Sequence, residues 1–181
     1  LSVADKAKLK TYNAKLAELQ TAFAQNVLKE ANASALVVDT REELAGMSET
    51  AIAKAADEAK ARGLDGKFAI PVVNTTTQAP LAVLTNRATR ERLLQASMAR
   101  GSRGGEFDNR ELVLQLAKLR AERAALLGYT SHAAYMLEDQ TAHDTDAVNK
   151  LLGEFAKPAV NNARRDAADI QKVIDADQGA F

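Results

Sequence analysis

The 181 residues suffice to bury one sizeable hydrophobic core, and their composition excludes several classes of protein. The 24 basic and 24 acidic residues cancel to a formal charge of zero, which argues against a nucleic-acid-binding surface or a polybasic membrane anchor. Cysteine is absent, so disulfides, thiolate metal sites and thiol catalysis are excluded. No apolar run approaches the roughly 18 residues of a membrane span. We expect one mainly helical domain over residues 1–181.

In chain order, the first 73 residues predict helices that alternate with two short strands. Ser2 and Asp5 have the spacing of a capping box, and the apolar residues after them recur at steps of three and four, so a long amphipathic helix should run to about Asn32. Ser48 predicts a second, alanine-rich helix that Gly63 ends. The other elements are a strand at 35–38, a helical turn at 40–45 closed by Gly46, and a strand at 67–73. The strands should pair in a direction that the sequence leaves open.

The second half predicts helices only. The polar residues 74–80 favour a cap for a helix at 81–100, and the glycines of 101–105 indicate a mobile loop. Three further helices follow: 108–128 with Asp108 and Glu111 as a capping box and Gly128 as its stop, a short one capped by Ser131, and a long one capped by Asp144 or Thr145 and kinked at Pro158.

The helix at 108–128 has an apolar surface too wide for an exposed helix, so we expect it to lie in the core. Arg120 projects from this apolar arc and should be partly buried beside a carboxylate or carbonyl partner. Arg103 lies in the glycine loop. The sequence therefore predicts that Arg120→Ala destabilises the protein more than Arg103→Ala does.

No residue pattern in the chain forms a complete catalytic, cofactor-binding or metal site. His132 and His143 are the only histidines, and neither has the helical spacing to a second ligand that zinc favours, so we interpret both as surface residues. No serine lies in a nucleophile motif. The loop GSRGG, with Arg100 and Arg103, is a weak candidate for phosphate binding. The carboxylate pairs Glu42 with Glu43 and Asp166 with Asp169, together with the excess of basic residues over 87–123, are interpreted as solvated surface.

One stretch nonetheless resembles a known family. The run LRAERAALLGY, with DNR before it and SHAAYMLEDQTA after it, is similar to the M3 family of zinc oligopeptidases. The segments LVVDTREELAGMSE and IQKVIDADQGAF, and NTTTQAP followed by NRATRE, resemble the bacterial peptidyl-dipeptidase (dipeptidyl carboxypeptidase) branch. The resemblance extends over essentially the whole chain and corresponds to part of the N-terminal half of such an enzyme.

The resemblance implies a role without chemistry of its own. Family members bind zinc through H-E-x-x-H, which does not occur here, so no catalytic or metal residue is carried over. We expect an inactive fragment that forms a helical wall of the substrate channel of an enzyme removing C-terminal dipeptides from oligopeptides. Its partners would be the catalytic C-terminal half and short peptides, in the cytoplasm or alternatively the periplasm. A free-standing helical interaction or peptide-binding module is the alternative.

Overall fold

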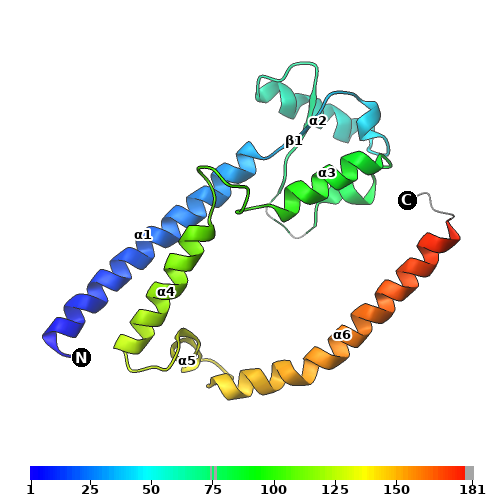
Figure 1. Cartoon of the computed structure of the whole chain (residues 1–181). Coiled ribbons are helices and arrows are strands. Elements are labelled where there is room, and N and C mark those ends of the chain that lie inside the picture. The colour runs from blue at the N-terminus through cyan, green and yellow to red at the C-terminus, as the bar shows by residue number, and fades with distance from the viewer. Residues whose placement is uncertain (74, 76, 178–181) are drawn as a thin grey trace. The chain divides into compact units, whose positions relative to one another are not determined.

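The computed structural model describes residues 1–73, 75 and 77–177, most of which lie in helices (Figure 1). The described residues form six α-helices, two short 3-10 turns and two strands, in the order α1 (Val3–Ala33), β1 (Leu36–Val38), η1 (Glu42–Leu44), α2 (Glu49–Ala61), β2 (Phe68–Ile70), η2 (Ala79–Ala82), α3 (Arg87–Met98), α4 (Arg110–Leu126), α5 (His132–Leu137) and α6 (Thr145–Ala176). The predicted class, mainly helical with two short strands, is confirmed. None of these helices is long and apolar enough to cross a membrane.

The chain divides into two compact units, and the division falls within α4. The first, here called the sheet unit, comprises residues 6–119. The second, here called the tail unit, comprises residues 1–5 and the chain from Arg120 onward. The single-domain organisation expected from the sequence stays a prediction.

The core of the sheet unit forms where β1 and β2 meet α2 and α3. The strands pair antiparallel with Leu36 opposite Ile70, which settles the direction that the sequence left open. Helix α2 contacts β2 and α3 contacts β1, because each presents apolar side chains to the strands. The buried residues of this core are Leu36, Val38, Leu44, Ile52, Ala55, Ile70, Val72, Leu84 and Leu93.

The predicted caps and stops around α1 and α2 are confirmed. The Asp5 backbone N–H donates to Ser2 Oγ at 3.1 Å, and the Ser2 N–H donates to the Asp5 carboxylate at 3.1 Å, so the capping box is reciprocal. Ser48 Oγ accepts the Ala51 N–H at 3.3 Å, and Gly63 follows α2 with φ of +72°. These local signals therefore determine where both helices begin or end.

The predicted single helix over 81–100 is wrong. Residues 79–82 form the turn η2, and α3 begins only at Arg87. Asn86 adopts an extended backbone conformation and its Oδ1 accepts the Thr89 N–H at 3.0 Å, so asparagine acts as a cap instead of continuing a helix. Of the segment predicted to cap the longer helix, Asn74 and Thr76 lie outside the described residues.

A buried glutamine holds the chain between β2 and η2. The Gln78 side chain is 2% exposed. Its Nε2 donates to Val73 O at 2.9 Å and to Ser97 Oγ at 3.2 Å, and its Oε1 accepts the Val73 N–H at 3.1 Å. The side chain thus satisfies both backbone groups of one residue and connects them to α3.

Replacing Gln78 with leucine should lower the free energy of unfolding by about 2 kcal/mol, because the Val73 N–H and the buried Ser97 hydroxyl lose the partner that Gln78 provides. Urea unfolding followed by circular dichroism measures this loss. A Gln95→Leu variant is the control, since Gln95 is exposed and its side chain donates to Glu91 within its own helix. Equal midpoints for the two variants would contradict the role assigned to Gln78.

The helix at 108–128 differs from the prediction in two ways: how it begins, and how much of it is buried. The Asp108 carboxylate accepts the N–H groups of Gly104 and Arg110, and Glu111 instead pairs with Gln115, so the predicted capping box does not form. The Arg110 guanidinium bound to Asp108 holds the pKa of that carboxyl well below its usual range.

Helix α4 buries one face, and part of its apolar surface lies exposed. Leu116 packs on Leu16 and Leu19 of α1, and the two helices lie side by side in Figure 1. Val113 and Leu114 are exposed, because α1 covers only one side of this part of α4. The wide apolar arc therefore does not place the whole helix in a core. The predicted stop is confirmed: Gly128 has φ of +91°, and the Tyr129 N–H donates to Ala124 O at 2.9 Å.

The tail unit contains the last two helices as predicted. Ser131 Oγ accepts the Ala134 N–H at 3.1 Å at the start of α5, and Asp144 Oδ1 accepts the Ala147 N–H at 2.7 Å at the start of α6. Pro158 lies inside α6, and the ribbon of α6 bends in the part of the colour scale that contains it (Figure 1).

Candidate functional site

The sheet unit contains an apolar groove of about 780 Å³, here called the α1/α4 groove. It lies between the C-terminal half of α1, the end of α3 with the loop after it, and the first turns of α4. Its apolar lining comes from Phe23, Val27, Ala31, Val72, Met98, Val113 and Leu114. A groove of this size and composition can accept apolar side chains of a peptide or of another helix.

A buried carboxylate lies at the edge of this groove. Glu30 of α1 is 7% exposed. It accepts the Gly101 N–H at 2.6 Å and the Arg103 Nε–H at 3.0 Å. Because Glu30 occupies the place that an anion would take, the weak candidate for phosphate binding at GSRGG has its own carboxylate partner. These two contacts also connect the loop that was predicted to be mobile to α1.

A buried amide pair fixes α1 against the start of α4. Asn109 is 3% exposed, and its Oδ1 accepts from Asn26 Nδ2 at 3.0 Å. Asn109 Nδ2 also donates to Phe23 O at 3.3 Å. These contacts position α4 so that Val113 and Leu114 face the groove.

The basic residues between 87 and 103 mainly bind backbone carbonyl groups. Arg90 donates to Leu84 O at 2.7 Å, and Arg92 donates to Val37 O at 2.7 Å. Arg100 and Arg103 also donate to carbonyl oxygens, those of Val73 and Ala96. The excess of basic residues in this stretch therefore ties connecting segments to α3, instead of forming an unpaired basic surface.

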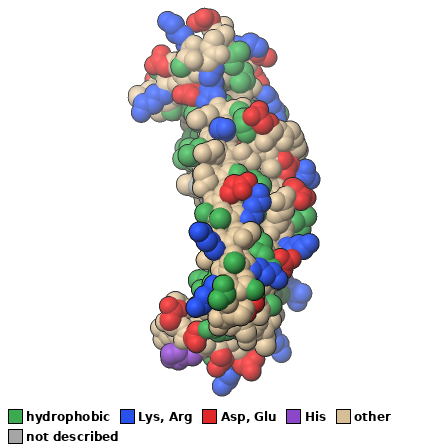
Figure 2. Space-filling view, turned by 90° about the vertical axis from the view of Figure 1, so that its left-hand side faces the viewer, with side chains coloured by type: hydrophobic (Ala, Val, Ile, Leu, Met, Phe, Trp, Pro, Cys, Tyr) green, Lys and Arg blue, Asp and Glu red, His purple; other side chains and the backbone are tan. Residues whose placement is uncertain are grey.

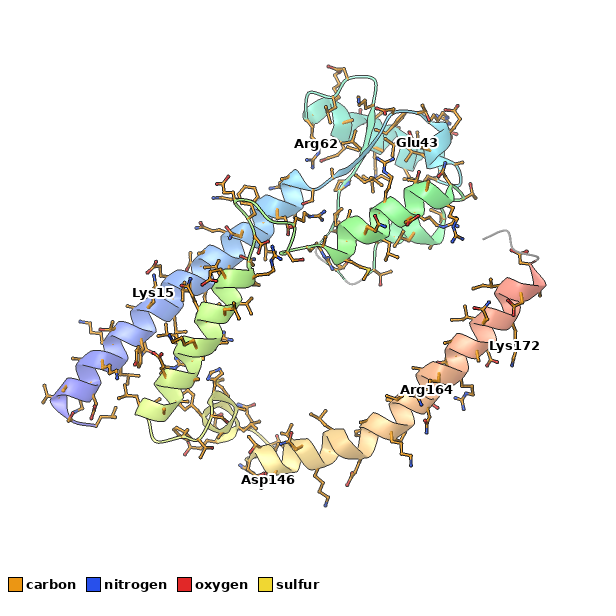
Figure 3. The ribbon with its side chains drawn as sticks, in the orientation of Figure 1. Lys15, Glu43, Arg62, Asp146, Arg164 and Lys172 are labelled. Carbon is orange, nitrogen blue, oxygen red and sulfur yellow. The ribbon has the colours of Figure 1, made fainter. Side chains whose placement is uncertain are left out.

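One member of each carboxylate pair noted in the sequence has structural partners. Glu43 Oε2 accepts the N–H groups of Asp39 and Thr40, and Glu43 Oε1 forms an ion pair with Arg92 at 3.1 Å. Asp169 pairs with Lys172 one turn later along α6. Figure 3 labels Glu43 beside the strands and Lys172 near the end of α6. On the face drawn in Figure 2, acidic and basic side chains are interspersed.

The histidines and serines form no reactive constellation in the described part of the chain. Within residues 1–73, 75 and 77–177 no group of three His, Cys, Asp or Glu side chains is placed to hold a metal ion. His143 is exposed and has φ of +60° just before the cap of α6. Ser97 accepts from Gln78, and Ser131 caps α5. Both of these serines therefore have a structural role.

Arg120 is half-buried, as expected, but its predicted partner is missing: none of the described residues offers it a carboxylate or carbonyl contact. It lies near His132, which begins α5 and also faces Arg123. Arg123 stacks over the Tyr135 ring at 5.3 Å from its centroid, and Tyr135 contacts the Tyr129 ring edge-on at 5.2 Å. The tail unit thus gathers cations and aromatic rings where α4 meets α5.

This cluster should make His132 titrate below the usual range. Burial first, and then the charges of Arg120 and Arg123, lower the pKa of His132 from its ordinary 6.5. Because the unfolded chain then binds the proton more readily, the free energy of unfolding should fall as the pH drops from about 6.5 toward the folded value. Above that window His132 is neutral in both states and contributes no pH dependence.

An NMR titration of the His132 ring measures this shift directly. Arg120→Gln should move the His132 midpoint upward by removing one of the two repelling charges. Arg165→Gln, which removes an exposed cation of α6, is the control. A His132 midpoint at or above 6.5 in the unsubstituted protein would contradict the arrangement.

Three buried polar residues were not found by reasoning from the sequence: Glu30, Gln78 and Asn109. Each lies in a stretch whose local pattern is ordinary, and each has partners in another element, up to 86 residues away for Asn109. A weak signal existed for Glu30 alone, because it faces the same side of α1 as Phe23 and Val27.

Comparison with known proteins finds one peptidase family and several related peptidases. The family model described as "Peptidase family M3" matches residues 81–181. The chain is 41% identical over its whole length to a dipeptidyl carboxypeptidase of Escherichia coli and 38% identical to that of Salmonella typhimurium. It is 30% identical to Escherichia coli oligopeptidase A over 91% of its length.

The matched region is a limited part of each relative. The chain covers 27% of the length of either dipeptidyl carboxypeptidase and 25% of the Escherichia coli oligopeptidase A. Nearly three quarters of each of these proteins therefore lies outside the match.

Proposed function

Because the chain belongs to peptidase family M3, we propose that it forms part of a zinc peptidyl-dipeptidase that removes C-terminal dipeptides from oligopeptides. The single observation that carries the proposal is the 41% identity to a dipeptidyl carboxypeptidase over all 181 residues. The identity to this relative is higher than the identity to oligopeptidase A, which favours a dipeptidyl carboxypeptidase. The substrates would be short peptides, and we expect the enzyme in the cytoplasm.

Within such an enzyme the chain serves as scaffold, as a helical wall of the substrate channel in the half that does not bind zinc. The described residues do not fit a zinc site, because no three of their His, Cys, Asp or Glu side chains are placed together to hold a metal ion. Zinc would therefore be held by sequence outside these 181 residues. The α1/α4 groove supports a wall role, since it offers apolar surface with ordered polar edges.

The proposal is tested by comparing the chain with the longer polypeptide that contains it. The longer protein should release a C-terminal dipeptide from a blocked tripeptide, lose this activity with a chelator and regain it with Zn²⁺. The 181-residue chain should release none under the same conditions. Release of dipeptide by the chain alone, or cleavage only in the interior of longer peptides by the longer protein, would overturn the proposal.

A free-standing peptide-binding module is the second candidate, and the α1/α4 groove is the observation that favours it. Titration calorimetry of the chain with short peptides distinguishes the two. Saturable binding that Leu114→Lys abolishes would support a module, because Leu114 is exposed in the groove. Absence of heat at millimolar peptide would remove this candidate.

A further inference from the structure

Helix α6 presents a long apolar face that its own unit leaves uncovered. The helix has 32 residues, and none of them is buried. Phe155 is 62% exposed and Val173 is 70% exposed, and α5 is its main neighbour within the tail unit. An amphipathic helix of this length normally owes its stability to packing of its apolar face.

The apolar positions form one stripe, which Asp166 interrupts. At 100° per residue, the side chains that share a side of α6 are Val148, Leu152, Phe155, Ala159, Ala163, Ile170, Val173 and Ile174. The opposite side holds Lys150, Lys157, Arg164 and Lys172; Arg164 and Lys172 are labelled along α6 in Figure 3. A stripe of this length with a charged reverse side is typical of a helix packed on one side.

Two observations indicate what covers the stripe. The family match runs through the whole of α6, so the helix is part of the shared family sequence. The relatives extend far beyond the matched region, which leaves nearly three quarters of their length available to contact this helix. An exposed stripe of this extent is uncommon in an isolated protein and marks an interaction surface.

We propose that the apolar stripe of α6 is the docking surface for the part of the full-length M3 peptidase that lies outside residues 1–181. The inference rests on the proposed function, because it takes the longer peptidase as the occupant. The covering surface is aliphatic or aromatic along the stripe. It supplies a basic side chain or N–H donors opposite Asp166, which lies between Ala163 and Ile170 on the same side of α6.

Thiol labelling tests the proposal at chosen positions, because the 181 residues contain no cysteine. Phe155→Cys and Ile170→Cys place a thiol on the stripe, and Lys157→Cys and Arg164→Cys place one on the charged side of the same helix. Maleimide labelling is timed in the longer protein and in the 181-residue chain, and the labelled peptide is identified by mass spectrometry. All four positions are exposed within the tail unit.

In the longer protein the two stripe positions should label at least about tenfold more slowly than the two control positions, because a packed side chain reacts only after local opening. In the 181-residue chain all four should label at similar rates. Similar rates in the longer protein would overturn the inference. Protection in the chain alone would also overturn it: the occupant would be a second copy if the protection grows with protein concentration, and the sheet unit of the same chain if it does not.

Hydrogen exchange on the unsubstituted protein covers the case in which a cysteine variant fails to fold. The amides of α6 should exchange at least about tenfold more slowly in the longer protein than in the chain. Dipeptide release is assayed on the same samples. An active enzyme with an unprotected stripe would refute the docking surface alone, whereas a protected stripe without dipeptide release would refute only the proposed function.

Discussion

Replacing Gly46 with alanine should lower the free energy of unfolding by about 3 kcal/mol or more, because two costs add at this position. Gly46 has φ of +94°, a conformation that residues with a Cβ rarely adopt. A Cβ built there would overlap the carbonyl oxygen of Val83 and would lie 3.0 Å from the backbone nitrogen of Thr85. Neither backbone group can move freely, since the Thr85 N–H donates to Ala45 O at 2.8 Å.

Gly63→Ala is the matched control. Gly63 also has a positive φ, of +72°, but a Cβ built there meets nothing within 4 Å. Only the conformational cost remains, so this variant should lose about 1 kcal/mol. Urea unfolding of both variants measures the difference. If the two lost the same free energy, the close approach of residues 83–85 to Gly46 would not be the cause.

The sequence predicted the features of the fold that depend on neighbouring residues. The capping box at Ser2, the cap at Ser48 and the stop at Gly128 each involve groups within five residues, so their chemistry is visible in the sequence itself. Both strands were found from short apolar runs between turn residues. Their antiparallel pairing could not be predicted, since a helix that joins two strands permits either direction.

Two errors concern local contacts that replace the predicted ones. The prediction placed Asn86 inside a helix and Glu111 in a capping box, whereas Asn86 accepts the Thr89 N–H and Glu111 pairs with Gln115. The burial of α4 was overestimated, because an apolar arc shows which side can be buried and not whether a neighbour exists to cover it. The same holds for α6. The sequence correctly predicted an amphipathic helix, but no neighbour in its own unit covers the apolar stripe.

The candidate site was predicted least well, because its polar residues are defined by contacts across the sheet unit. Glu30 resembles any solvated glutamate on a long helix until the loop at 101–103 is placed against it. The opposite error was made for Arg120, whose apolar neighbours in the sequence suggested a buried ion pair. Burial and pairing are separate properties, and the sequence indicated only the first.

Arg103→Ala should destabilise the protein by about 3 kcal/mol, because it leaves the buried Glu30 carboxylate with the Gly101 N–H as its remaining partner. Arg120→Ala should cost about 1 kcal/mol, mainly from packing of its aliphatic stem. This order reverses the one expected from the sequence. The Arg103 side chain is 29% exposed and that of Glu30 is 10% exposed, so solvent screens the pair only in part.

A double-mutant cycle separates the ion pair from the loss of either side chain. Glu30→Gln keeps an acceptor for the Gly101 N–H and removes the charge, so Arg103→Ala should cost much less in that background than in the unsubstituted protein. Chemical unfolding of the four proteins gives the coupling free energy. Additive effects, or a larger loss for Arg120→Ala than for Arg103→Ala, would show that Glu30 does not depend on Arg103. The glycine loop would then owe its position to the Asp108 contact with Gly104.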